Sequence, residues 1–129
     1  MKRLIYALIG ITLVVSVSLI FLGANTTNPG VKHITITGLD EDWFLADADL
    51  TTDIDLWAIV FYPSATDDQL IVHDDGIDGD EIFDSGLCAD KYDRTVLYYP
   101  PGFFVNPVID ITDCTLGTAA NAKVKIYFR

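Results

Sequence analysis

The chain has 129 residues, the size of one ordinary domain. Its charge is unevenly divided: the first thirty residues contain only Lys2 and Arg3 as charged side chains, and all 19 acidic residues follow them. From Val31 onward, 19 acids face six Lys and Arg, which makes a net charge of about −13. This charge argues against nucleic acid or an anionic membrane as a partner of the domain, because phosphate contacts need clustered basic side chains. It favours solubility, cation binding or partners with basic patches.

The first 24 residues predict a membrane segment. Leu4 to Ala24 is a run of 21 residues without charge or proline, and Lys2 and Arg3 before it favour a cytoplasmic N-terminus. As a helix this run spans ~30 Å, the thickness of a bilayer core, whereas a secretory apolar region usually has only ~7–15 residues. We therefore expect an N-terminal apolar helix within residues 1–24 that acts as an uncleaved signal-anchor and places the domain outside the cytoplasm.

Two alternatives for this segment stay open. Ser16-Val17-Ser18 fits the small-x-small rule for cleavage, and removal of the signal would make the domain a secreted protein. Val31 begins a self-contained pattern, and in a bacterial or viral gene it can also mark an alternative start. Residues 25–30 (NTTNPG) are expected to form a short polar linker.

Residues 31–129 consist of short apolar runs separated by turn residues. Seventeen of the 19 acids are Asp, which suits turns, and only two are Glu, which suits helices. The clearest strands are 54–62 (IDLWAIVFY), apolar on both faces and therefore central, and the alternating C-terminal run 123–128. Shorter strands are predicted at 34–37, 69–73, 81–83, 94–99 and 103–111.

Two connections have features of their own. The acidic run 40–55 is predicted to be a connection with one helical turn around 43–48. Pro107 interrupts the run 103–111 and indicates an edge strand or a bulge, because proline cannot donate to a ladder. The seven or eight short strands predict an all-β domain, an antiparallel β-sandwich of jelly-roll or Ig-like type or a small barrel, preceded by the N-terminal helix.

An acidic loop is the first candidate site. Ca²⁺ takes roughly 6–8 oxygen ligands from flexible loops, and a run of carboxylates interleaved with Gly76 and Gly79 could supply several. The residues are Asp74, Asp75, Asp78, Asp80, Glu81 and Asp84. Their order does not match the EF-hand loop, and the alternative is an acidic hairpin connection that faces water. No cofactor besides Ca²⁺ is expected.

The two cysteines, Cys88 and Cys114, allow two predictions. In an exported domain they would pair as a disulfide, which contributes ~3–4 kcal/mol in the chain-entropy model. In a reducing compartment both would be small buried apolar residues. Spacing alone does not decide between these outcomes, because it does not show whether the two side chains face each other.

The chain is predicted not to be an enzyme. Its two histidines, His33 and His73, lie in or at predicted strands, and no candidate nucleophile lies in an elbow or a family signature. The candidate nucleophiles are Ser64, Ser85, Cys88 and Cys114. The cysteines and histidines also lack the close spacing that zinc sites use.

Several aromatic residues lie near turns, where a carbohydrate or protein partner could stack on them. They are Trp43, Phe44, Tyr98, Tyr99, Phe103 and Phe104. The alternative is that these rings close the ends of a small core.

Residues 54–68 (IDLWAIVFYPSATDD) and 98–114 (YYPPGFFVNPVIDITDC) resemble small phage and prophage structural proteins, the head-decoration-like β-sandwiches of virion surfaces. The shared features are a strand that ends in a PSA turn followed by an acid, a YYPPG corner, a PVID strand and a terminal AKVKIYF strand. The resemblance covers most of residues 32–129 and implies a structural role. The apolar N-terminus departs from it, because a protein that binds a capsid from the cytoplasm does not need one.

The most economical hypothesis is a non-catalytic structural or surface module on a virion or a cell envelope. It would act through self-assembly or a surface lattice, with a membrane contact through residues 4–24. The alternative is an exported, calcium-stabilised binding or adhesion module that recognises glycan or protein through its end loops.

Overall fold

The computed structural model describes residues 30–129. The chain divides into two units, and the second, Val31–Arg129, forms the domain described below. The predicted apolar helix within residues 1–24 and most of the linker at 25–30 lie outside the described residues. Between residues 30 and 129, no helix is long and apolar enough to cross a membrane.

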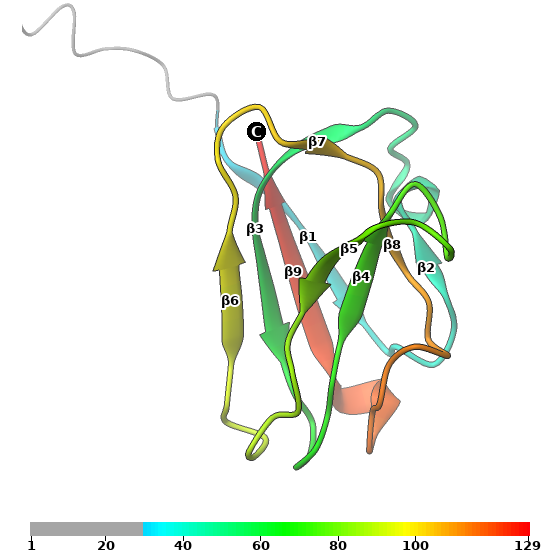
Figure 1. Cartoon of the computed structure of the whole chain (residues 1–129), viewed down its shortest axis with the longest axis vertical. Coiled ribbons are helices and arrows are strands. Elements are labelled where there is room, and N and C mark those ends of the chain that lie inside the picture. The colour runs from blue at the N-terminus through cyan, green and yellow to red at the C-terminus, as the bar shows by residue number, and fades with distance from the viewer. Residues whose placement is uncertain (1–29) are drawn as a thin grey trace, which may run out of the picture. The chain divides into compact units, whose positions relative to one another are not determined.

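Nine strands form two antiparallel sheets around one core (Figure 1), which confirms the all-β prediction. Sheet A has the order β1–β9–β3–β6, with the short β7 also paired to β3, and sheet B has the order β2–β8–β4–β5. The strands are β1 (Lys32–Thr37), β2 (Trp43–Phe44), β3 (Ile54–Tyr62), β4 (Ile71–Asp74), β5 (Glu81–Asp84), β6 (Thr95–Tyr98), β7 (Phe104–Val105), β8 (Pro107–Ile109) and β9 (Lys123–Phe128). Two 3₁₀ helices complete the domain, η1 (Leu45–Ala48) and η2 (Ala119–Asn121).

The central position predicted for the strand at 54–62 is confirmed. β3 pairs with β9 on one side and β6 on the other, and its N-terminal end also pairs with β7. A register irregularity between Leu56 and Ala58 changes the alternation, so that Leu56, Ile59 and Phe61 are fully buried on the core side. Because the outer face of β3 also holds apolar residues, the strand appears continuous and apolar in the sequence.

The segment around Pro107 differs from its prediction. The predicted strand 103–111 is two strands, β7 and β8, which pair in different sheets. β8 lies between β2 and β4, so it is not the edge strand that the proline suggested. Pro107 is tolerated there because it is the first residue of the strand, where proline is allowed. The preceding N–H, that of Asn106, donates to the Asp74 carboxylate at 2.7 Å.

The C-terminal strand has the predicted alternation. In β9, Val124, Ile126 and Phe128 are buried in the core, and the residues between them lie on the outer face of sheet A. The helical turn predicted around 43–48 is η1, but the structure places a short strand, β2, just before it. β2 has only two residues, too few for a period-2 pattern to predict.

A buried carboxylate joins two loops beneath the core. Asp68 is fully buried, and its Oδ2 accepts hydrogen bonds from the Ser64 N–H, the Ser64 hydroxyl at 2.8 Å and the Ala65 N–H at 3.0 Å. Its Oδ1 accepts from the Gly117 N–H at 2.6 Å. A Cβ on Gly117 would lie 2.9 Å from that of Ala65, so this close approach requires glycine. Asp68 therefore links the β3–β4 connection to the β8–β9 connection.

Candidate interaction surface

A row of rings crosses the outer face of sheet A. The Tyr127 ring lies 5.4 Å from the His33 ring and 5.9 Å from the Trp57 ring, and Trp57 lies 5.9 Å from Tyr98 on its other side. These four residues come from β1, β9, β3 and β6, so the row spans the full width of the sheet. Tyr98 is 66% exposed. Aromatic rings in such tilted and edge-to-face contacts form a rigid, partly apolar platform.

A groove of about 280 Å³ runs beside this row. Ala58 and Val60 are among its lining residues and are themselves buried, whereas Arg94 and Tyr62 are shared with a second, more open hollow of about 510 Å³. The Lys125 ammonium lies 6.0 Å from the centre of the Tyr62 ring, within cation–π reach. The groove thus combines aromatic and cationic side chains. We name the ring row and the two hollows the sheet A face.

Charge is segregated between the two sheets. All six basic side chains of residues 31–129 lie in sheet A or beside it: Lys32, Lys91, Arg94, Lys123, Lys125 and Arg129. Asp55 is the only acid in the strands of sheet A, and it is engaged by the Arg129 guanidinium at 3.6 Å and the Gly102 N–H at 2.9 Å. The strands of sheet B contain three acids and no Lys or Arg. A domain with a strongly negative net charge therefore carries its basic side chains on or beside sheet A, with Asp93 the acid that lines the more open hollow.

The structure divides the six predicted aromatics between the surface and the core. Tyr98 lies in the ring row, but Trp43, Tyr99 and Phe103 pack against the core, as the alternative proposed. Tyr99 stacks on Phe103 with 5.0 Å between ring centres and donates its hydroxyl to the Ile82 carbonyl at 2.6 Å. Burial raises the pKa of the Tyr99 hydroxyl.

The remaining predicted aromatics, Phe44 and Phe104, are exposed, at 42% and 64%. Trp57 and Tyr127 were not among the predicted aromatics because they lie within strands, and Tyr62, the last residue of β3, was not among them either. A usable signal was present in the C-terminal run, where Tyr127 shares the outward positions with Lys123 and Lys125.

The acidic loop predicted as a calcium site connects β4 to β5. Its side chains are used separately: Asp74 accepts from the Asn106 N–H at 2.7 Å, and Asp84 accepts from the Gln69 side chain and the Gly86 N–H. Asp75, Asp78, Asp80 and Glu81 are exposed. Within residues 30–129 no three His, Cys, Asp or Glu side chains are close enough together to hold a metal ion. Calcium binding by this loop therefore stays a prediction that depends on rearrangement of the loop.

Thermal unfolding tests the calcium prediction. If the loop binds Ca²⁺, the melting temperature of the full-length chain rises in calcium relative to EDTA, because a ligand that binds only the folded state stabilises it. Asp80→Asn should then remove the rise, and Asp53→Asn, outside the loop, should leave it intact. An identical melting temperature in calcium and in EDTA would contradict the prediction.

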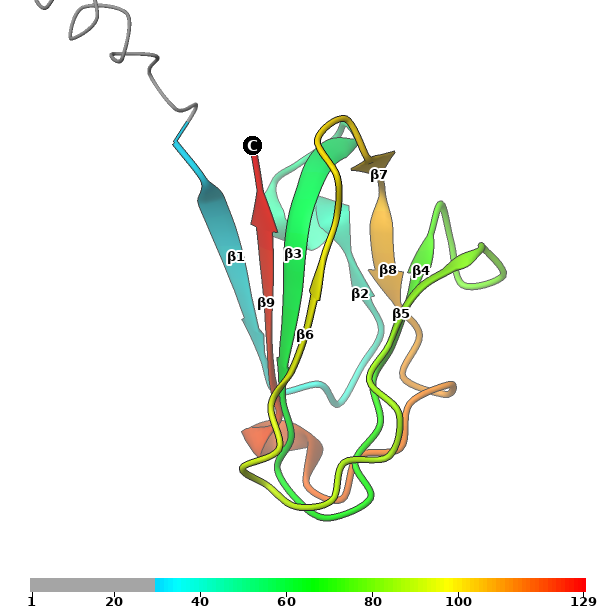
Figure 2. The same cartoon turned by 60° about the vertical axis from the view of Figure 1, so that its left-hand side comes forward.

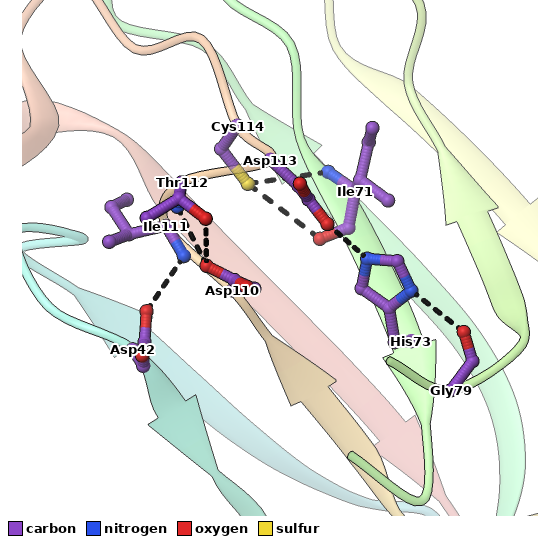
Figure 3. Close-up of polar contacts among 9 residues, drawn as sticks. All are labelled: Asp42, Ile71, His73, Gly79, Asp110, Ile111, Thr112, Asp113 and Cys114. Atoms are coloured by element: carbon purple, nitrogen blue, oxygen red, sulfur yellow. Dashed lines mark hydrogen bonds and ion pairs between the residues drawn. The ribbon is translucent and has the colours of Figure 1, made fainter. Parts of the chain in front are cut away.

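His73 is held by two acceptors (Figure 3). Its Nδ1 lies 3.1 Å from the Gly79 carbonyl oxygen and its Nε2 lies 3.1 Å from the Asp113 carboxylate. Both ring nitrogens thus have a partner, and the ring ties the β4–β5 loop to the segment after β8.

The neighbouring segment is held by carboxylates (Figure 3). Asp110 accepts from the Thr112 hydroxyl at 2.7 Å and from the Thr112 N–H at 2.8 Å, and these bonds lower the pKa of Asp110. The Asp42 carboxylate accepts from the Ile111 N–H at 2.9 Å. The Asp110–Thr112 bonds are local turn bonds of the kind that Asp forms with nearby backbone. The Asp42 bond instead joins the β1–β2 connection to the segment after β8.

The candidate nucleophiles all make structural contacts. The Ser64 hydroxyl donates to Asp68, and the Ser85 hydroxyl donates to a neighbouring carbonyl. Both cysteines are free thiols in the structure. Cys88 is buried, and the Cys114 Sγ lies 3.5 Å from a backbone nitrogen of β4 and 3.7 Å from a carbonyl oxygen of the same residue. Burial raises the pKa of both thiols, which disfavours the nucleophilic thiolate.

No family model, no curated protein and no solved structure matches this chain.

Proposed function

We propose that this chain is a non-catalytic structural or surface module that acts through assembly on a virion or a cell envelope. The sheet A face is its contact surface. In the same proposal, residues 4–24 hold the domain at the outer side of a membrane. The resemblance of residues 54–68 and 98–114 to virion-surface proteins supports this role.

The order of the strands supports a jelly-roll type for the domain. A jelly roll has eight strands in two sheets, ordered about as 1-8-3-6 and 2-7-4-5 from two Greek keys. If β7 and β8 count as one interrupted strand, sheets A and B have these orders. Figure 2 shows β7 running directly into β8 at the top of the domain. Jelly rolls form capsid and lectin domains, so this type is compatible with a surface role.

The single observation that carries the proposal is the ring row on the outer face of sheet A, in which Tyr98 is exposed and Trp57 and Tyr127 are half-buried. Tyr, Trp and Arg are the residues enriched at the energetic centres of interfaces. Here Trp57, Tyr98 and Tyr127 lie in ring contact on the outer face of sheet A, with Arg94 in the adjoining groove. A rigid platform of this kind loses little conformational entropy when a partner binds.

One alternative is favoured by the same groove. An exported binding module would stack a glycan on the rings, because sugar faces pack well on aromatic side chains. The two functions differ in their partner and share the surface, so the sheet A face is tested first.

Fractionation of the full-length protein from its native source tests the proposal. We expect it to sediment with virions or envelopes. Because residues 4–24 would hold the chain in a membrane by themselves, the effect of the sheet A face is measured after detergent extraction. There, Trp57→Ala with Tyr98→Ala should weaken association with the remaining assembly by about thirtyfold or more, the factor that a loss of ~2 kcal/mol at a single hot-spot residue gives. Phe44→Ala is the matched control, because it removes an exposed ring from sheet B.

Two results would contradict the proposal. A strictly monomeric protein that never associates with particles, filaments or membranes would exclude an assembly role. Equal loss of association in the Phe44→Ala control would show that the sheet A face is not the specific surface.

A further inference from the structure

The loop between β4 and β5 is a rigid projection. Figure 2 shows it leaving the domain on the sheet B side, away from β1 and β9. Its backbone is held by bonds from the Asp74 N–H to the Asp80 carbonyl at 2.9 Å and from the Gly79 N–H to the Gly76 carbonyl at 3.1 Å. Asp75, with φ of 60°, donates its N–H to the Asn106 carbonyl at 3.0 Å. A loop fixed in this way is ordered before it meets a partner.

The exposed side chains of this loop complement the sheet A face. Asp75, Asp78 and Asp80 supply negative charge, and Ile77, 44% exposed, supplies an apolar tip. The sheet A face supplies Lys125 and Arg94 beside a groove lined by rings and by the buried Ala58 and Val60. Opposite charges around an apolar contact are the arrangement that steers association and fixes its register.

We propose that the sheet A face binds a second copy of this chain, through the acidic β4–β5 loop of that copy. Ile77 would enter the ring-lined groove, and Asp78 and Asp80 would meet Lys125 and Arg94. This inference rests on the proposed function and names the partner of the same surface. Because the two surfaces lie on different sheets, the contact is head-to-tail, and repetition generates a ring or a filament.

Zero-length cross-linking tests the contact directly. A carbodiimide joins a lysine amine to a carboxylate as an amide with loss of water, so only touching pairs react. A mixture of ¹⁴N- and ¹⁵N-labelled full-length chains is treated and digested, and mixed-isotope peptides report links between copies. We expect Lys125 linked to Asp78 or Asp80, with less product in high salt. Association through other parts of the chain would not join these residues.

Charge reversal gives the second test. Arg94→Glu with Lys125→Glu, and separately Asp78→Lys with Asp80→Lys, should each weaken self-association by about tenfold or more. The two variants mixed together should associate again, because each now meets an opposite charge. Glu41→Lys with Asp53→Lys is the control: it reverses two exposed acids outside both surfaces and should preserve the Lys125 cross-link.

The outcomes separate this inference from the function on which it rests. If no mixed-isotope link involves Lys125, or if mixing the reversed variants restores nothing, the second copy is the wrong partner. If sedimentation with particles or envelopes still depends on Trp57 and Tyr98 in that case, the assembly role stands and a different protein or a glycan occupies the face. If the Lys125 link is absent and association with particles or envelopes does not depend on Trp57 and Tyr98, both proposals are wrong.

Discussion

Asp68→Asn should lower the free energy of unfolding by about 3 kcal/mol at neutral pH, since it leaves buried donors without an acceptor. Asp68 receives bonds from both the N–H and the hydroxyl of Ser64, and from the N–H groups of Ala65 and Gly117. An amide of the same shape has one acceptor oxygen and turns its NH₂ group toward N–H donors. Urea unfolding of the full-length chain, followed by tryptophan fluorescence, measures the difference.

The loss should also depend on pH. Burial by itself raises the pKa of Asp68, but the bonds from Gly117, Ser64 and Ala65 outweigh it and hold the pKa below its usual value of 3.8. A carboxyl with a lowered folded-state pKa stabilises the protein above its unfolded pKa, and this contribution is lost as pH falls through the folded pKa. The difference between wild type and Asp68→Asn should therefore be full at neutral pH and shrink below about pH 4.

Asp67→Asn is the matched control for this prediction. It removes the same charge from the adjacent position, where the side chain is exposed and φ is 64°, a conformation that asparagine adopts readily. Its effect should stay within about 0.5 kcal/mol. Equal effects at the two positions, or a pH-independent loss at Asp68, would show that the buried bonds are not the cause.

Gly79→Ala should destabilise the domain by about 3 kcal/mol, because a Cβ at this position would overlap the Asp74 carbonyl oxygen. That oxygen belongs to the backbone, so it cannot move aside as a flexible side chain would. A backbone movement that relieved this overlap would also displace the Gly79 carbonyl oxygen, which lies 3.1 Å from the Nδ1 of His73. The melting temperature of the full-length chain should fall by about 10–20 °C.

Gly86→Asn provides the comparison. Gly86 has φ of +62°, and no atom lies within 4 Å of the position where a Cβ would be. Asparagine tolerates this conformation and keeps the N–H that bonds to Asp84 at 2.7 Å, so the melting temperature should change little. If Gly79→Ala were as mild as Gly86→Asn, the loop would be softer than its geometry implies, and the rigid projection proposed above would lose its basis.

The strands with a strong local pattern were predictable. β3 and β9 have the predicted bounds, because nine consecutive strand residues and six strictly alternating ones each give a clear signal. β2 was missed because two residues carry no period, and the run 103–111 was misread because pairing in two sheets is not a local property. The sequence predicted that aspartates would accept hydrogen bonds from backbone at turns. It did not predict which residues donate to them, because Asp74 and Asp68 accept from residues far along the chain.

The candidate site was less predictable than the fold. The sequence indicated Tyr98 among six aromatics near turns, but Trp57 and Tyr127 join it only because β9 pairs between β1 and β3. The same pairing places Lys123 and Lys125 of β9 on this face, with Arg94 just before β6. Likewise, the carboxylates of residues 74–84 are adjacent in sequence, yet Asp74 and Asp84 turn to separate partners in space.

By itself, the sequence determined the all-β class, the central and terminal strands, and the acidic character of residues 31–129, because these follow from composition and from periods of a few residues. Only the tertiary structure decided that the basic and aromatic side chains share one face and that Asp68 is buried between two loops. The physical reason is that strand order and loop contacts join residues 40 or more positions apart, and no local pattern encodes which of them meet.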